Sequence, residues 1–230
     1  MAHSLILGMT ETGKTSLARN LCAHYRRKDF ETIVLDPLRD PRWGASFITS
    51  DGDEFLDICK RSKKCMLFMD EGSESVGRYD TEMQWTATQA RHWGHSSHFI
   101  SQGAIQLAPI IRDQCTHVFL FCSGIKSGKL LAEEFNAPDL EICTSLKRGE
   151  YFHAVKGGVC TFHSSLRSYD NAFTSHVTRE RNFRDRRSAG AQEKTRKVDG
   201  DSNSGGGGAI TSGDDGQSGG GDSGSGGDGD

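Results

Sequence analysis

The residues with the most specific chemistry lie near the N-terminus, in the stretch Gly8-Met9-Thr10-Glu11-Thr12-Gly13-Lys14-Thr15, which has the pattern G-x-x-x-x-G-K-T. Glycines in this pattern let the backbone curl so that successive N–H groups point at the phosphates of a nucleotide. Lys14 supplies a cation to the phosphate oxygens, and the Thr15 hydroxyl is a ligand for Mg²⁺. The sequence therefore predicts a site for ATP and Mg²⁺ formed by Gly8, Met9, Thr10, Glu11, Thr12, Gly13, Lys14, Thr15 and Ser16.

A pair of acids follows the most apolar stretch of the chain, Cys65–Met69. Asp70 is placed to hold the metal, through water or directly, and Glu71 is placed to polarise an attacking water as a general base. Nucleotide kinases seldom need a carboxylate in the second position, because their nucleophile is a substrate oxygen. The pair therefore favours hydrolysis over phosphoryl transfer to a small molecule.

A polar side chain, Gln102, ends the predicted strand His98–Gln102. The carboxyl ends of neighbouring parallel strands meet at the nucleotide site of such sheets. We therefore expect Gln102 to reach the γ-phosphate or the lytic water.

Alternating apolar runs and helical patterns predict an α/β domain with a mostly parallel sheet and a C-terminal β-hairpin. The glycine-rich loop then joins a first strand to a first helix, as phosphate binding requires. The expected strands are His3–Leu7, Thr32–Asp36, Cys65–Asp70, His98–Gln102 and His117–Phe121, with a hairpin from Tyr151–Val155 and Val159–Phe162. The expected helices are Lys14–Arg26, Asp53–Arg61, Thr81–His92 and Lys129–Phe135.

Composition divides the 230 residues into unlike parts. Residues 199–230 hold 14 glycines, seven aspartates and no Lys or Arg, which is typical of a disordered tail. Because seven of the 31 acids fall there, residues 1–198 carry 28 basic against 24 acidic side chains. We expect an ATPase domain over 1–163, a basic extension over 164–198 and the acidic tail over 199–230.

Several classes of protein are disfavoured. No apolar run approaches the roughly 18 residues of a membrane span, and the N-terminus lacks the features of a signal peptide. Seven cysteines without a Cys-x-x-Cys pair predict reduced, mostly buried thiols in a reducing cytoplasm. His92, His95 and His98 have a metal-like spacing, but the spacing crosses a helix-to-strand turn, so packing or DNA contact is the preferred interpretation.

The order and spacing of five motifs resemble the FtsK/HerA superfamily of DNA-pumping ATPases. Within it, the chain is similar to the genome-packaging ATPases of tailless icosahedral viruses with an internal membrane and double-jelly-roll capsids. The resemblance covers roughly residues 4–162. The motifs are the glycine-rich loop, Asp36-Pro37, Leu67-Phe68-Met69-Asp70-Glu71, Ala90–His95 leading to Ile100-Ser101-Gln102, and Ala108–Gln114.

The resemblance implies a RecA-like fold and a ring oligomer, commonly a hexamer, around double-stranded DNA. It implies that Lys14 and Thr15 bind nucleotide, that Asp70 holds Mg²⁺, that Glu71 is catalytic and that Gln102 senses the γ-phosphate. Glu11 departs from the family, which usually has a small residue there, and an inward-pointing carboxylate would weaken nucleotide binding.

Ring ATPases usually need an arginine from the neighbouring subunit. Arg91 is the first candidate for this role, and Arg78 and Arg112 are the alternatives. Sequence-independent DNA contact calls for Lys and Arg that bind phosphates. The candidates are Lys60–Lys64, Lys126 and Lys129, Lys147-Arg148, and the segment Arg179–Lys197, which has a net charge of +5.

We therefore expect an ATP phosphohydrolase that packages a viral genome into a preformed capsid. It would act in the host cytoplasm and at the packaging vertex of the virion, where it would contact capsid proteins without inserting into a membrane. One alternative is a related ATPase for DNA transfer, segregation or phage secretion. A second is a nucleotide-gated assembly protein at a capsid vertex with little turnover, and a third is a kinase-type phosphotransferase, for which no arginine-rich lid is evident.

Overall fold

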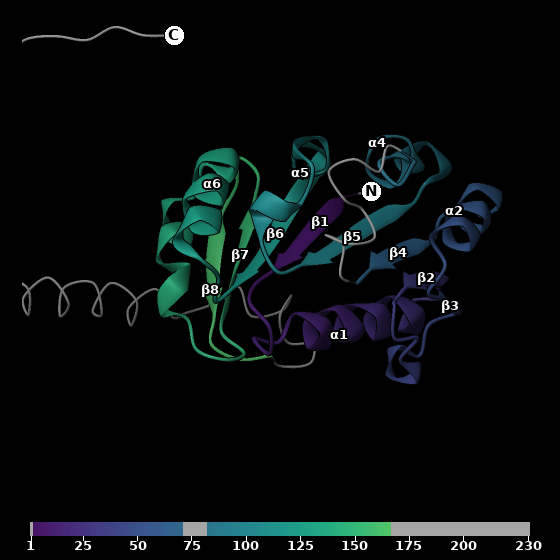
Figure 1. Cartoon of the computed structure of the whole chain (residues 1–230), viewed down its shortest axis with the longest axis horizontal. Helices are drawn as coiled ribbons and strands as arrows, with labels where there is room; N and C mark the ends of the chain where they lie inside the picture. Colours follow the sequence, from purple (N-terminus) through teal and green to yellow (C-terminus); the bar gives the residue numbers. More distant parts are fainter. Residues whose placement is uncertain (1, 71–81, 167–230) are drawn as a thin grey trace, which may run out of the picture. The chain divides into compact units, whose positions relative to one another are not determined.

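The protein is built on an eight-stranded sheet with the order β3-β2-β4-β5-β1-β6-β7-β8. The computed structural model describes residues 2–70 and 82–166. The six strands β1 to β6 are parallel to one another, and β7 and β8 continue the sheet in antiparallel pairing (Figure 1). The strands are β1 (His3–Leu7), β2 (Thr32–Leu35), β3 (Phe47–Thr49), β4 (Met66–Met69), β5 (Ser96–Ser101), β6 (Cys115–Phe121), β7 (Tyr151–Val155) and β8 (Cys160–His163).

Helices cover both faces of this sheet. Helix α1 lies on one face, and α2, α4, α5 and α6 lie on the other (Figure 1). The α-helices are α1 (Lys14–Arg27), α2 (Gly52–Arg61), α4 (Trp85–Thr88), α5 (Pro109–Gln114) and α6 (Ile125–Phe135). Short 3₁₀ helices are η1 (Pro41–Trp43), η2 (Ala90–Trp93), η3 (Ala104–Gln106) and η4 (Pro138–Ser145).

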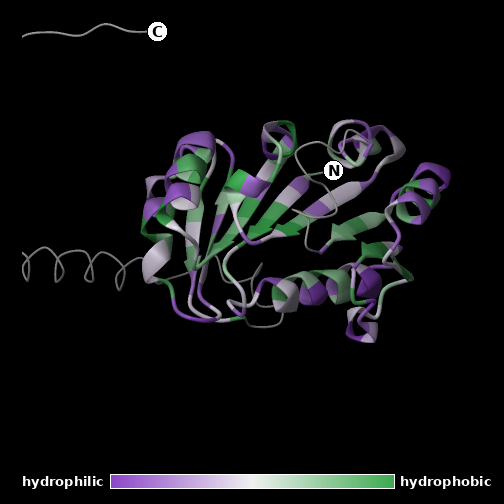
Figure 2. Ribbon diagram, viewed as in Figure 1, coloured by the Kyte–Doolittle hydropathy of each residue, from purple (hydrophilic) through white to green (hydrophobic). Residues whose placement is uncertain are grey.

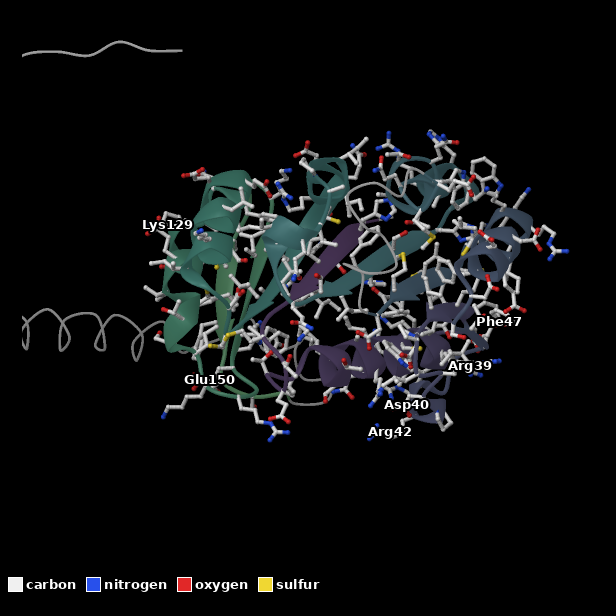
Figure 3. The ribbon with its side chains drawn as sticks, viewed as in Figure 1. Arg39, Asp40, Arg42, Phe47, Lys129 and Glu150 are labelled. Carbon is white, nitrogen blue, oxygen red and sulfur yellow. The ribbon has the colours of Figure 1, made fainter. Side chains whose placement is uncertain are left out.

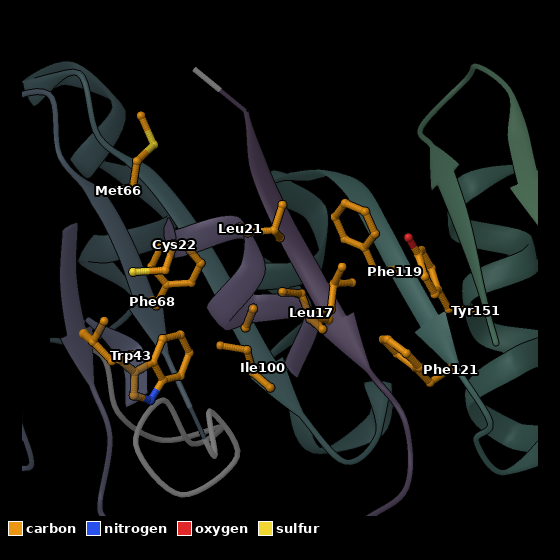
Figure 4. Close-up of a cluster of buried hydrophobic side chains, with 13 residues drawn as sticks. Leu17, Leu21, Cys22, Trp43, Met66, Phe68, Ile100, Phe119, Phe121 and Tyr151 are labelled. Atoms are coloured by element: carbon orange, nitrogen blue, oxygen red, sulfur yellow. The ribbon is translucent and has the colours of Figure 1, made fainter. Parts of the chain in front are cut away.

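The central strands are buried on both sides because both faces of the sheet are covered. All residues of β1, β2, β4 and β5 are buried. Under α1, the side chains of Leu17 and Leu21 pack with Ile6, Phe68 and Phe119 in one cluster (Figure 4). Apolar residues line the strands and the inner sides of the helices, while polar residues face outward (Figure 2). This packing fixes where each strand ends.

The sequence predicted the fold class correctly. Each expected strand and the terminal hairpin occur within two residues of their predicted bounds. The periodicity missed the three-residue strand β3 and the short helix α5, which are too brief to show a repeating apolar pattern.

The helix predicted over Thr81–His92 was wrong in its extent. Between Glu82 and Trp93 the chain forms the four-residue helix α4 and then the 3₁₀ helix η2 in place of one long helix. The hydroxyls of Thr86 and Thr88 donate to the carbonyls of Met83 and Gln84, and this local bonding together with β-branching disfavours a long helix.

None of the helices within residues 2–70 and 82–166 combines the length and apolar character needed to cross a bilayer. The predicted basic extension and acidic tail lie, apart from residues 164–166, outside the described residues.

Candidate nucleotide-binding site

The glycine-rich loop is suspended between the ends of two strands. The N–H of Gly8 donates to the carbonyl of Ser101 at 3.3 Å, and the N–H of Met9 donates to the carbonyl of Cys122 at 2.8 Å. These bonds fasten the loop to the carboxyl ends of β5 and β6. Gly13 then starts α1 in a left-handed conformation, with no side chain capping the helix. The N-terminus of α1 thus lies at the end of the glycine-rich loop, the kind of helix end at which anions bind in other proteins.

Both glycines of the pattern have backbone conformations that favour glycine. Gly8 has a φ of 157°, and a Cβ there would lie 2.6 Å from the Cβ of Phe121. Gly13 has a φ of 118°, and a Cβ there would lie 2.7 Å from Cδ1 of Leu166. Both conformations favour glycine, and Gly8 in addition has no room for a side chain.

Lys14 reaches back across the loop. Its Nζ donates to the carbonyl of Met9 at 2.8 Å, and the hydroxyl of Thr12 donates to the same carbonyl at 2.7 Å. Only 8% of Lys14 is exposed. The ammonium is therefore held inside the curl of the loop, where phosphate oxygens would need a cation.

The structure brings together the two predicted metal ligands, Thr15 in the first turn of α1 and Asp70 directly after β4. The hydroxyl of Thr15 donates to Oδ2 of Asp70 at 3.2 Å, and Asp70 is 8% exposed. Asp70 is positioned by its own N–H, which donates to the carbonyl of Leu35 on β2. A hydroxyl and a carboxylate are the hard oxygen ligands that Mg²⁺ prefers, so this pair fits the predicted metal.

Gln102 lies where the sequence placed it, directly after β5, and it is exposed. It lines an open pocket of about 640 Å³ together with Met9 and Thr10 of the loop. The pocket is also lined by four residues that the sequence did not predict as part of the site, namely Gly103, Ile105, Gln106 and Ser127. Their only local signal is that they follow the ends of β5 and β6.

Two other predicted loop residues, Glu11 and Ser16, are exposed. Glu11 has a φ of 63°, which is unusual for a residue other than glycine. The predicted catalytic base, Glu71, and the alternative arginine Arg78 lie outside the described residues.

Arg91 precedes β5 and therefore lies on the side of the amino end of this strand, whereas the glycine-rich loop is bonded to its carboxyl end. It belongs to η2, whose last residue Trp93 accepts a hydrogen bond from the N–H of Lys64 at 3.0 Å. Its charge also helps to lower the pKa of the buried His3 to about 4, after burial itself. Arg91 is exposed.

Arg112, an alternative to Arg91, is buried in the fold. Its guanidinium pairs with Glu134 on α6 and donates to the carbonyls of Ala104 and Leu107. These bonds explain Arg112 as a strut between η3, α5 and α6. All three nitrogens of the guanidinium group have partners in these bonds.

His95, His98 and most of the cysteines lie in the core. The ring of His95 accepts from the N–H of Cys65 through Nδ1, and Nε2 lies 3.1 Å from the carbonyl of Cys59. His98 stacks on Phe68 with ring centroids 4.5 Å apart. No group of three metal-ligating side chains occurs in the described part of the chain. Five of the seven cysteines are buried, which agrees with the prediction that most of the thiols are buried.

The buried Asp36 of the Asp36-Pro37 motif organises the loop after β2. Its carboxylate accepts from the N–H groups of Leu38 and Asp40 and from Nε1 of Trp43. Asp40 in turn pairs with Arg42 and with Arg19 of α1 (Figure 3). The motif therefore stabilises the end of β2, where the carbonyl of Leu35 accepts the N–H of Asp70.

No protein-family model matches the sequence, and no curated protein is similar to it. The structure, however, is similar to the genome-packaging NTPase B204 of Sulfolobus turreted icosahedral virus 2 in complex with AMPPCP. The TM-score is 0.62 at 16% identity, over 72% of this chain and 98% of B204.

Two further solved structures are similar. VirB4 of Thermoanaerobacter pseudethanolicus has a TM-score of 0.54 at 12% identity, over 74% of this chain and 91% of VirB4. The pCW3 conjugation coupling protein TcpA has a TM-score of 0.58 at 13% identity, over 74% of this chain and 62% of TcpA. At such identities the likeness establishes the fold alone. The chain has the RecA-like P-loop NTPase fold that its resemblance to FtsK/HerA ATPases predicted.

Proposed function

We propose that this protein hydrolyses ATP with Mg²⁺ and uses the reaction to move double-stranded DNA into a preformed viral capsid. The observation that carries the proposal is the contact between Thr15 and Asp70 beside a complete glycine-rich loop. The similarity in fold to a viral genome-packaging NTPase supports it over most of that protein's length.

The described residues supply the nucleotide half of this function. The loop N–H groups and Lys14 bind the phosphates and hold their charge. Thr15 and Asp70 hold Mg²⁺, which neutralises phosphate charge when bound. Gln102 contacts the γ-phosphate side of the site from the open pocket, and Glu71 takes a proton from the attacking water.

Contact with DNA is assigned to a basic surface at the amino edge of the sheet, formed by Lys60, Lys63, Lys64 and Arg91. All four side chains are exposed, and the bond from Lys64 to Trp93 brings the two segments together. Phosphate contacts of this kind do not depend on base sequence, as a motor requires. We further propose that the subunits form a ring at a capsid vertex. The resemblance to FtsK/HerA ATPases, which commonly form hexamers, supports a ring of this kind.

The similarity in fold to the conjugation coupling protein TcpA supports a second candidate, a related ATPase that acts in DNA transfer. Both candidates predict ATP hydrolysis stimulated by double-stranded DNA. The test compares the rate with and without DNA for the wild type, Lys14→Ala and Glu71→Gln. We expect stimulation in the wild type and loss of activity in both variants. Undiminished hydrolysis in Glu71→Gln would show that Glu71 is not the general base. A wild-type protein that stays monomeric and whose ATPase rate does not change with DNA would exclude a DNA-translocating motor.

A further inference from the structure

A tight turn from a distant part of the chain is bonded to the glycine-rich loop. The turn spans Lys147–Glu150 and leads into β7. The N–H of Gly149 donates to the carbonyl of Thr12 at 2.9 Å. This places Lys147 and Arg148, which the sequence analysis selected for contact with DNA, beside the candidate nucleotide site. Glu150 lies at the same lower edge of the molecule as the start of α1 (Figure 3).

The turn is internally closed, so it presents this N–H group in a fixed direction. The N–H of Glu150 donates to the carbonyl of Lys147 at 3.0 Å, and the carboxylate of Glu150 accepts from the N–H of Lys147 at 2.9 Å. Gly149 has a φ of 82°. This is the conformation that a type II turn requires at its third residue, and it favours glycine.

The bond to Thr12 determines the direction of a neighbouring N–H group. A trans peptide is planar, and its C=O and N–H point in opposite directions. Because the Thr12 carbonyl points at Gly149, the N–H of Gly13 points away from the turn. Rotation of this peptide would break the bond to Gly149 and change the direction of the Gly13 N–H. Gly13 is moreover close to Leu166 and Phe121, which limits other movements.

We infer that Gly149 is a positioning residue for the nucleotide: its N–H holds the Thr12–Gly13 peptide in the orientation in which Gly13 donates to phosphate. The inference rests on the proposed nucleotide site and extends it to the turn before β7. In the same arrangement, the two cations of the turn add positive charge near the phosphates. The β7–β8 hairpin is thereby tied to the loop through a single backbone bond.

The chain offers a matched control for this role. Gly157 lies in the turn between β7 and β8, has a φ of 69°, and, like Gly149, has open space around an added Cβ. Alanine at either position suffers the same backbone strain without a steric clash. Of the backbone hydrogen bonds that these two turns make, only the bond from Gly149 reaches the glycine-rich loop. Asparagine tolerates positive φ and serves as the conservative variant.

The experiment measures the affinity of the full chain for AMPPCP with Mg²⁺, together with the thermal stability of each variant. We expect Gly149→Ala to weaken binding by about tenfold, the cost of roughly one charge-assisted hydrogen bond. Gly157→Ala should lose similar stability but bind within about twofold of the wild type, and Gly149→Asn should recover most of the affinity.

If Gly149→Ala does not fold, Glu150→Ala provides the test, because it opens the turn without a change at a positive φ. Equal affinity of Gly149→Ala or Glu150→Ala and the wild type would overturn the inference. So would an equal loss of affinity in Gly157→Ala. By contrast, a wild type that binds AMPPCP no better than Lys14→Ala would overturn the proposed nucleotide site itself.

Discussion

The hydroxyl of Thr15 lies 3.2 Å from Oδ2 of Asp70, so a polar contact joins the first turn of α1 to the end of β4. Parallel strands bring about this meeting. β1 and β4 both flank β5, and their carboxyl ends therefore lie at the same edge of the sheet. Two short motifs that are remote in sequence thus supply one set of oxygen ligands.

Removal of the Thr15 hydroxyl should weaken nucleotide binding only when Mg²⁺ is present. Thr15→Val keeps the shape of the side chain but removes a metal ligand, and we expect a loss of about tenfold or more in Mg²⁺-dependent affinity. Thr15→Ser keeps the hydroxyl and is the matched control. Titration of a fluorescent ATP analogue with Mg²⁺ and then with EDTA measures the effect. An equal defect in EDTA would show that Thr15 acts through packing instead.

Substitution of Glu11 should improve the protein in two separable ways. Its φ of 63° is strained for glutamate, so Glu11→Gly should relieve a backbone cost of about 1 kcal/mol, partly offset by a more flexible unfolded chain. Glu11→Gln keeps the strain but removes the charge, and it should tighten nucleotide binding by about two- to fivefold at low salt. Unfolding curves and nucleotide titrations of both variants separate the two effects. Unchanged affinity in Glu11→Gln would mean that this carboxylate lies too far from the phosphates to matter.

Arg91 should affect DNA binding through its charge. Arg91→Ala should weaken binding to duplexes of any sequence and reduce the slope of log affinity against log salt by about 1. Arg39→Ala removes the same charge from the exposed loop after β2 and is the control (Figure 3). Filter binding at several salt concentrations measures both. Normal DNA affinity combined with a large fall in ATP hydrolysis would instead assign Arg91 to the site of a neighbouring subunit.

The stability of the fold should decrease in mild acid because of buried imidazoles. Burial, with repulsion from His3 and His117, lowers the pKa of His98 to about 3, from an ordinary value of 6.5. Below pH 6.5 the unfolded chain therefore binds a proton that the folded chain does not. Stability is complete above this pH and falls toward pH 3, by about 1.4 kcal/mol per unit for this group.

His3 and His153, with pKa values lowered by burial to about 4 and about 3, add to the same slope. His98→Phe retains a ring to stack on Phe68 and should reduce the slope by the share of one imidazole. Urea unfolding at intervals from pH 8 to pH 5 measures it. Parallel curves for the wild type and His98→Phe would contradict the lowered pKa.

The sequence determined the local elements and the chemistry of the loop. Strand β1, Gly8, Gly13 and helix α1 follow from apolar periodicity and from conformations that only glycine adopts easily, and both signals are local. The apolar run before Asp70 likewise predicts a strand buried on both faces. The parallel arrangement followed from the alternation of such strands with helices, so the meeting of Thr15 and Asp70 could be predicted without coordinates.

Only the tertiary structure decided which distant side chains became neighbours. It buried Arg112 against Glu134, placed Arg91 beside Lys64 at the amino edge, and brought Gly149 to Thr12. Nothing in the local sequence distinguishes a buried arginine from an exposed one, or a free turn from one bonded to a loop. These contacts depend on the order of strands in the sheet and on how closely the helices and turns pack around it, and both are set by the whole chain.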